Sequence, residues 1–262
     1  MEVLGYMASL FIGISLGLIG GGGSILTVPI LVYLFNVNPK LATTYSLFIV
    51  GLTASFGAIR HYKMGNIKVK SAIYFAIPSL VSLLLVRKTI LLRIPTEIPF
   101  TNTLLIKRDL VIMVLFAILM VLASYSMIKK QQVSDSIVNE IKPLYLIFIG
   151  GIVGLITGFL GAGGGFLIIP ALLFFAKMKM KQAVGTSLLI IAFNSLLGFA
   201  GDVINGVEMN YPFLLLIAFI AGIGIFIGTF LSKKMDGEQL KPIFGWFVLV
   251  MGIYIIIKEL AF

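Results

Sequence analysis

Eight apolar stretches fill most of this chain, and their length constrains the fold more than any other feature of the sequence. A helix needs about 20 mainly apolar residues to cross the hydrocarbon layer of a bilayer. The stretches run approximately over residues 3–35, 41–59, 69–86, 110–128, 144–176, 183–200, 213–231 and 243–257. In lipid each should be a helix, because the backbone polar groups must find partners within their own segment. The sequence therefore predicts an all-α integral membrane protein with about eight transmembrane helices.

The low charge content supports this interpretation. Charged residues make up 11% of the chain, whereas a soluble domain has about 25%. The net charge is +10, but the basic residues form short clusters between apolar stretches, without interleaved aromatic residues, so no nucleic-acid binding is predicted. The chain has no cysteine and one histidine, which excludes thiolate ligands and argues against zinc. We predict no metal and no cofactor.

Glycine runs interrupt the two longest apolar stretches near their middle. Four consecutive glycines occupy residues 20–23, and residues 161–165 read Gly-Ala-Gly-Gly-Gly. A glycine in a helix interior costs about 1 kcal/mol relative to alanine, so a cluster of them favours a break. We expect both helices to be broken at these runs.

An internal repeat relates the two halves of the chain, because matching residues recur at a constant offset of 141. Chance similarity among apolar residues does not explain matches that also include glycine, proline and serine. The sequence predicts a first four-helix repeat over 1–130, a polar linker over 131–142 and a second four-helix repeat over 143–262. The matching pairs include Gly13 and Gly154, Gly17 and Gly158, Gly23 and Gly164, Pro29 and Pro170, Ser46 and Ser187, and Gly65 and Gly206.

The relative orientation of the two repeats depends on the geometry of the glycine breaks. With four crossings in each repeat, the repeats are parallel and related by an axis along the membrane normal. If each break instead closes a hairpin, the parity changes and the repeats are inverted. The sequence leaves both arrangements open.

The glycine breaks are also candidate binding sites for an anion. A break in a membrane helix frees backbone amides, and the helix that starts after it carries about half a positive charge at its N-terminus. Two such starts brought together would hold an anion. The alternative is that the glycines only permit close helix packing. The candidate donors are the backbone amides and hydroxyls of Gly22, Gly23, Ser24, Thr27, Gly163, Gly164 and Gly165.

Hydroxyl residues near the start of the second and sixth helices form another candidate group. They are Thr44 and Ser46 in the first half, and Thr186 and Ser187 in the second. Such hydroxyls either cap a helix or coordinate an oxyanion from the side, and the sequence leaves both open.

The basic cluster at the end of the second helix has two interpretations as well. Arg60 and His61 lie there, where basic residues most often anchor a helix at the membrane edge. The functional alternative is a gate that attracts an anion, with His61 as a proton relay. Asp202 and Glu208 are expected in a loop outside the membrane. No acidic residue lies deep in an apolar stretch, so a buried carboxylate that couples protons is not expected.

These motifs together carry a resemblance to a known family. A glycine-rich break followed by a proline, then the helix start Gly185-Thr186-Ser187-Leu188, repeated in two halves, resembles the sulfite exporter TauE/SafE family of membrane transporters. The first half departs from this pattern, with Thr44-Tyr45-Ser46 where Gly-Thr-Ser would be typical. The resemblance covers essentially the whole chain.

The resemblance implies transport of sulfite or an organosulfonate across the cytoplasmic membrane. The expected partners are a small anionic solute and the lipid bilayer, while the sequence leaves the coupling ion, the direction of transport and self-association open. A passive anion channel is the nearest alternative. A membrane-embedded hydrolase that uses Ser24 and His61 is disfavoured, because the second repeat has Gly165 and Asp202 at the matching positions.

Overall fold

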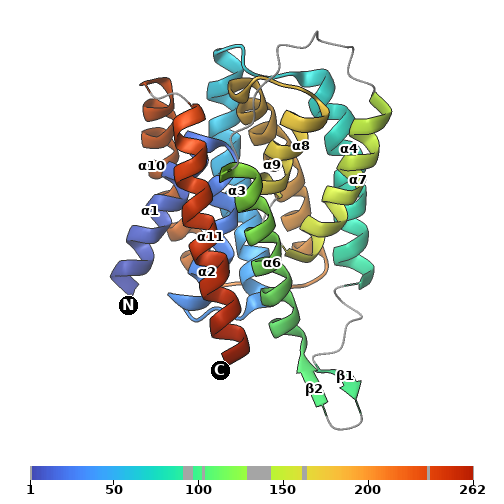
Figure 1. Ribbon diagram of the computed structural model, residues 1–262. Coiled ribbons are helices and arrows are strands. Elements are labelled where there is room, and N and C mark those ends of the chain that lie inside the picture. Colours follow the sequence, from blue (N-terminus) through green and yellow to red (C-terminus); the bar gives the residue numbers. More distant parts are fainter. Residues whose placement is uncertain are drawn as a thin grey trace.

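Helices make up most of the described residues in the first half of the chain in the computed structural model (Figure 1). The structure describes residues 2–90, 97–101, 104–128, 143–160, 164–234 and 237–261. The helices of the first half are α1 (Glu2–Ile19), α2 (Gly22–Tyr33), α3 (Pro39–Lys63), α4 (Val69–Leu85), the π-helical turn η1 (Val86–Ile90) and α6 (Arg108–Ile128).

A small antiparallel hairpin lies between η1 and α6 in the sequence. Its strands are β1 (Glu97–Thr101) and β2 (Leu104–Lys107), and Ile98 pairs with Ile106. This hairpin, which no sequence pattern predicted, extends from one end of the helical body (Figure 1).

The described elements of the second half are all helices. They are α7 (Pro143–Leu160), α8 (Gly165–Phe175), α9 (Met180–Ile204), α10 (Tyr211–Lys234) and α11 (Gly237–Ala261). Each of the eight apolar stretches thus corresponds to one helix or, at the two glycine runs, to a pair of helices. The predicted linker over 131–142 lies outside the described residues, so the domain boundaries stay a prediction.

Several of these helices suit a membrane by length and composition. Among the described residues, the helical segments Pro39–Lys63, Val69–Thr89, Met180–Ile204 and Tyr211–Ser232 are long and apolar enough to cross a bilayer, and several shorter apolar helices accompany them. The outward faces carry large exposed apolar side chains, such as Ile77, Phe148 and Phe219. A helix that is apolar on its outer side as well as its inner side is typical of a membrane protein.

The first glycine break closes a hairpin. Helix α1 ends at Ile19 and α2 begins at Gly22, and α2 then returns along α1. The far ends of the two helices meet, since the Tyr6 and Phe35 ring centroids lie 5.4 Å apart. Nearer the turn, a Cβ atom on Gly23 would lie 2.2 Å from the Ile12 carbonyl oxygen. The close approach of the two backbones therefore requires glycine at this position.

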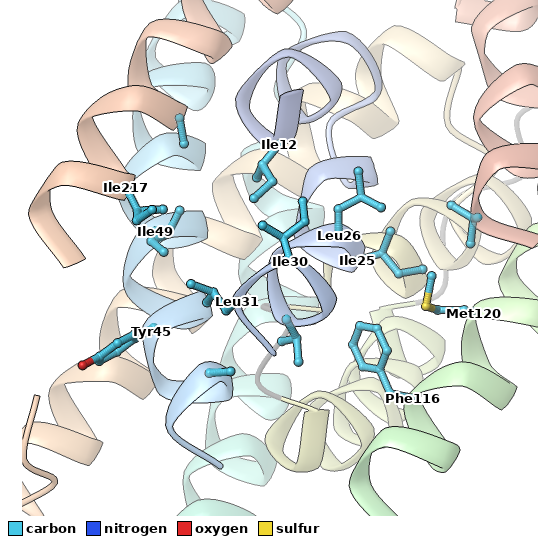
Figure 2. Close-up of a cluster of buried hydrophobic side chains, with 14 of the residues drawn as sticks. Ile12, Ile25, Leu26, Ile30, Leu31, Tyr45, Ile49, Phe116, Met120 and Ile217 are labelled. Carbon is cyan, nitrogen blue, oxygen red and sulfur yellow. The ribbon is translucent and has the colours of Figure 1, made fainter. Parts of the chain in front are cut away.

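Helix α2 is buried inside the helical body. Ile25, Leu26 and Leu31 of α2 pack with side chains of α1, α3, α6 and α10, such as Ile12, Phe116 and Ile217 (Figure 2). Because α2 is surrounded by protein, its apolar residues cover all sides of the helix rather than one stripe.

Glycines on the first helix of each half allow that helix to pack closely against a helix of the other half. On α1, Cβ atoms at Gly13 and Gly17 would collide with the backbone of α10. On α7, Cβ atoms at Gly154 and Gly158 would meet α4 and η1 in the same way. These glycines match each other at the offset of 141, and small residues let membrane helices approach closely. These four matching glycines of α1 and α7 therefore serve packing.

Helices α3 and α9 lie antiparallel at the centre of the molecule. Thr44 near the start of α3 contacts Asp202 near the end of α9, whereas His61 near the end of α3 lies against Gly185 near the start of α9. Helices α6 and α11 also lie side by side (Figure 1). The ends of α1 and α11 that are nearest the chain termini lie at the same end of the body as the β-hairpin (Figure 1).

Candidate functional site

The two glycine breaks meet in the interior. A Cβ atom on Gly21 would lie 2.3 Å from the Gly165 carbonyl oxygen, and one on Gly165 would lie 2.8 Å from the Ser24 Oγ atom. The start of α2 and the start of α8 are therefore in direct contact through residues without side chains. This contact joins two segments that are far apart in the sequence.

The backbone at the first break leaves amides free at the start of α2. Gly20 has a φ angle of +80°, and its amide donates to the Leu16 carbonyl oxygen at 2.7 Å, which ends α1. Gly21 precedes α2 and offers no side-chain cap. The first amides of a helix have no acceptor within that helix, and Gly22 and Gly23 lie in this first turn.

The second break has a related geometry. Helix α7 ends at Leu160, and Gly164 before α8 has a φ angle of +72°. The Gly164 carbonyl oxygen accepts the amides of Leu167 and Ile168, both at 3.0 Å, which begins α8. The predicted donor Gly163 lies outside the described residues. The expectation that both long helices are broken is confirmed.

The hydroxyls beside the first break bond locally. The Ser24 hydroxyl donates to the Gly21 carbonyl oxygen at 2.7 Å, and the Thr27 hydroxyl donates to the Gly23 carbonyl oxygen at 3.0 Å. Either hydroxyl must rotate before it can donate to a solute. Their role in anion binding stays a prediction.

The second group of predicted hydroxyls lies inside helices rather than at their ends. Helix α3 begins at Pro39 and is capped by the Asn38 side chain, which accepts the Lys40 amide at 3.0 Å. Helix α9 begins at Met180 and lacks a side-chain cap. Thr44, Ser46, Thr186 and Ser187 therefore do not cap these helices, and the capping interpretation is wrong for them.

The two serines of this group face different surroundings. The Ser187 hydroxyl donates to the Val184 carbonyl oxygen at 2.9 Å and lies 3.5 Å from the Gly20 carbonyl oxygen at the first break. Ser46, its match at the offset, is fully buried, and its hydroxyl has no hydrogen-bond partner among the described residues. The role of Ser46 in anion binding stays a prediction.

Two further residues that match at the offset anchor loops. The Thr186 hydroxyl oxygen accepts the Lys68 amide at 3.0 Å, which holds the connection between α3 and α4 against α9. Tyr45 matches Thr186, and its hydroxyl oxygen accepts the Asn210 amide at 2.7 Å. The sequence analysis assigned Thr186 to the site, but its hydroxyl oxygen supports a loop.

The predicted gate residues lie near the end of α3. His61 lies against Gly185, and Val184, the residue before Gly185, lies against Gly20 of the first break. The Arg60 guanidinium donates to the Thr229 hydroxyl at 2.8 Å, which links α3 to α10. His61 is only 3% exposed, and both ring nitrogens lack a hydrogen-bond partner among the described residues. Ser24 bonds Gly21 instead of His61, so the two residues do not form the pair that a serine hydrolase requires.

A buried ion pair that the sequence analysis missed lies beside the second break. Arg87 of η1 and Asp202 of α9 are 3% and 5% exposed, and the Arg87 Nε atom donates to the Asp202 Oδ1 atom at 2.8 Å. A second guanidinium nitrogen of Arg87 contacts the Asp202 Oδ2 atom. The expectation that Asp202 lies in an external loop is wrong, because α9 continues to Ile204.

Thr44 and the backbone of α7 complete this cluster. The Thr44 hydroxyl donates to the Asp202 Oδ2 atom at 2.7 Å and accepts from Arg87 at 3.0 Å. Arg87 also donates to the Gly158 carbonyl oxygen at 3.4 Å, two residues before the end of α7. The Arg87 cluster, consisting of Arg87, Asp202, Thr44 and the Gly158 carbonyl, therefore connects both halves of the chain.

Comparison with known proteins identifies the family. A family model described as sulfite exporter TauE/SafE matches residues 6–255. The chain belongs to this family.

Several known proteins match this chain over nearly its full length, and each is named as a probable membrane transporter protein. The relative from Xylella fastidiosa is 29% identical over 262 residues, which covers 95% of this chain and 93% of the relative. The relative from Bacillus subtilis is 28% identical over 260 residues, with coverage of 98% and 100%. One from Methanocaldococcus jannaschii is 27% identical, with coverage of 94% and 92%. The chain is therefore a membrane transporter of the TauE/SafE family.

One sequence signal pointed toward the missed cluster. The offset of 141 pairs His61 with Asp202 and Thr44 with Gly185, so the two halves place different polar residues at matching positions. The structure brings each of these residues against the other half, because α3 and α9 are antiparallel. The repeat alone could not reveal Arg87, since the match between the halves is lost after Val86.

Proposed function

We propose that this TauE/SafE protein is a secondary transporter, and not an enzyme, that moves sulfite or an organosulfonate across the cytoplasmic membrane. The solute class follows the family description. The proposed binding site lies where the starts of α2 and α8 meet, with the amides of Gly22, Gly23, Gly164 and Gly165 as anion donors.

The contact between the two helix starts carries this proposal. The Gly21 and Gly165 backbones touch, so the positive ends of two helix dipoles face a common region. Each end is equivalent to about half an elementary charge. Two ends together suit a single negative charge, and neither requires a basic side chain at that point.

The unpaired Ser46 hydroxyl provides a second, independent support. A buried polar group without a partner costs about 1–3 kcal/mol, so such a group calls for a ligand. An oxyanion would accept the Ser46 hydrogen and remove that cost. Ser187 at the matching position lies next to the first break, which supports a role for this pair of matching serines.

The packing of α3 and α9 supports inverted rather than parallel repeats. These helices match at the offset, yet they run in opposite directions. The α1–α2 hairpin supplies the change of parity that inversion requires. In transporters with inverted repeats, substrate sites lie at the repeat interface and are formed by discontinuous helices.

A flux assay in proteoliposomes tests the proposed function. We expect saturable uptake of sulfite or of methanesulfonate, and weaker uptake of chloride. Ser46→Ala should raise KM by about 10- to 150-fold, because a hydrogen bond to a charged group contributes about 1.5–3 kcal/mol. Ser55→Ala is the matched control on the same helix, since the Ser55 hydroxyl donates to the Gly51 carbonyl oxygen. Ohmic single-channel currents would favour the channel alternative, and absence of flux for every sulfur oxyanion would overturn the proposal.

Cysteine labelling tests the inversion directly, because the chain has no native cysteine. Lys63 and Ile204 match at the offset, and both side chains are exposed at the ends of α3 and α9. If the repeats are inverted, a membrane-impermeant maleimide should label Lys63→Cys and Ile204→Cys from opposite sides of the membrane. Labelling of both from one side would indicate parallel repeats.

A further inference from the structure

The Arg87 cluster holds a full positive charge and a full negative charge away from water. Removing an ion from water costs several kcal/mol even after the protein relaxes, and a partner charge with good hydrogen bonds must offset that cost. Both carboxylate oxygens of Asp202 contact the Arg87 guanidinium, and these contacts offset the cost of burying its charge. The cluster is therefore neutral in the conformation described here.

The cluster is next to the proposed anion site. Arg87 donates to the Gly158 carbonyl oxygen, two residues before α7 ends at the second break. Thr157, the residue before Gly158, lies against Gly164 at the second break, where a Cβ atom on Gly164 would be 2.4 Å from the Thr157 methyl group. The Arg87 guanidinium, which is already bound to a carboxylate, therefore bonds α7 one residue from the side chain that contacts a proposed anion donor.

Charge balance decides what happens when the anion enters. A monoanion that binds Arg87 while Asp202 is ionised leaves one net negative charge in the protein interior, which is strongly unfavourable. A proton taken up by the Asp202 carboxylate from the aqueous phase makes that side chain neutral. The Arg87 charge then balances the anion alone, and the loaded site is neutral again.

We propose that Asp202 is the proton-binding residue of this transporter and that Arg87 passes from the Asp202 carboxylate to the anion when the proton binds. The inference rests on the proposed function and adds the coupling ion to it. One monoanion moves with one proton, so the transport cycle is electroneutral. The Thr44 hydroxyl contacts both side chains and is placed to orient the protonated carboxyl group.

Few other ionisable groups surround Asp202. On the elements packed against α9, Arg87 of η1 contacts it directly, and Lys88 next to Arg87 is exposed. On α3, the Tyr45 hydroxyl is bonded to the Asn210 amide. Helix α8 carries no titratable side chain. Arg60, His61, Tyr62 and Lys63 lie at the far end of α3, where His61 is against Gly185 near the start of α9. The remaining groups with described side chains are half-buried Lys40 at the start of α3, Lys70 and Tyr74 at the far end of α4, and Tyr254, Lys258 and Glu259 of α11, of which Glu259 accepts a hydrogen bond from Tyr33.

Proton movement in proteoliposomes tests the inference. Vesicles that contain the full chain and a trapped pH-sensitive dye receive methanesulfonate on the outside. This probe is the anion of a strong acid and carries no proton of its own, unlike sulfite. We expect the lumen to become more acidic as labelled methanesulfonate enters, with about one proton for each anion, and we expect the uptake rate to be insensitive to an imposed membrane potential.

Two variants separate coupling from a merely structural role. Asp202→Asn imitates the neutral carboxyl group, so we expect it to lose acidification while it retains exchange of labelled for unlabelled methanesulfonate. Glu208→Gln, an exposed residue in the next connection, should behave as the wild type. Asp202→Glu should restore acidification if Asp202→Asn folds poorly.

The outcomes distinguish the two proposals. Methanesulfonate uptake without acidification in the wild type overturns proton coupling and leaves the proposed function standing. Acidification by Asp202→Asn at the wild-type rate also overturns it. Absence of uptake of every sulfur oxyanion overturns both proposals.

Discussion

Replacing Arg87 with methionine removes the charge that balances Asp202 and keeps a side chain of similar length. The variant loses two contacts to the carboxylate, one to Thr44 and one to the Gly158 carbonyl oxygen. Asp202 then retains one hydrogen bond, from Thr44. Breaking a buried ion pair on one side costs about 3–5 kcal/mol, because an unpaired charge remains in the interior.

The double variant shows whether the charges or the packing cause this loss. Replacing Asp202 with leucine in the Arg87→Met background removes both charges, and replacement of a buried pair by apolar residues is often neutral or stabilising. We therefore expect Arg87→Met and Asp202→Leu each to lose about 3–5 kcal/mol. The double variant should recover most of this loss in unfolding free energy but should not recover proton-coupled transport.

The measurement is unfolding of the purified protein in mixed micelles by sodium dodecyl sulfate, followed by circular dichroism. Arg60→Met is the matched control, because the Arg60 guanidinium donates to the Thr229 hydroxyl and the Phe226 carbonyl oxygen and forms no ion pair within the described part of the chain. The loss for this variant should be about 1 kcal/mol. Single variants at Arg87 and Asp202 with wild-type stability would show that the pair is not buried. A double variant as unstable as the single variants would refute the electrostatic explanation.

Three further predictions concern the glycines. Gly154→Ala should destabilise the protein by about 1–3 kcal/mol, because its Cβ atom would lie 2.1 Å from a carbonyl oxygen of α4. Gly222→Ala is the control and should not destabilise the protein, since a Cβ atom there would have no other atom within 4 Å. Unfolding by detergent measures both variants. Gly164→Ala should lower the free energy of unfolding by more than about 1 kcal/mol because Gly164 has a positive φ angle. The clash of the new Cβ atom with the Thr157 methyl group, 2.4 Å away, should add to this loss. Full anion uptake by this variant would argue against a site at the second break. Gly65 also has a positive φ angle, but its surroundings are open, so Gly65→Asn should be tolerated better than Gly65→Val in the same unfolding assay.

The sequence by itself determined which segments are helical and where two of them break. Apolar length predicted each helix, and the glycine runs at 20–23 and 161–165 predicted the breaks. These features are local, because backbone hydrogen bonds in lipid must close within a segment and clustered glycines weaken the same segment. The offset of 141 also paired Ser46 with Ser187, and both lie inside α3 and α9.

Only the tertiary structure decided how the halves face each other and which charges meet. Whether α2 continues away from α1 or folds back along it depends on the fit between Gly23 and the Ile12 backbone, and no local pattern specifies that choice. Arg87 and Asp202 are 115 residues apart in the sequence. They meet because α9 runs antiparallel to α3 and ends beside η1, and their burial became favourable only when the folded helices brought the two opposite charges together.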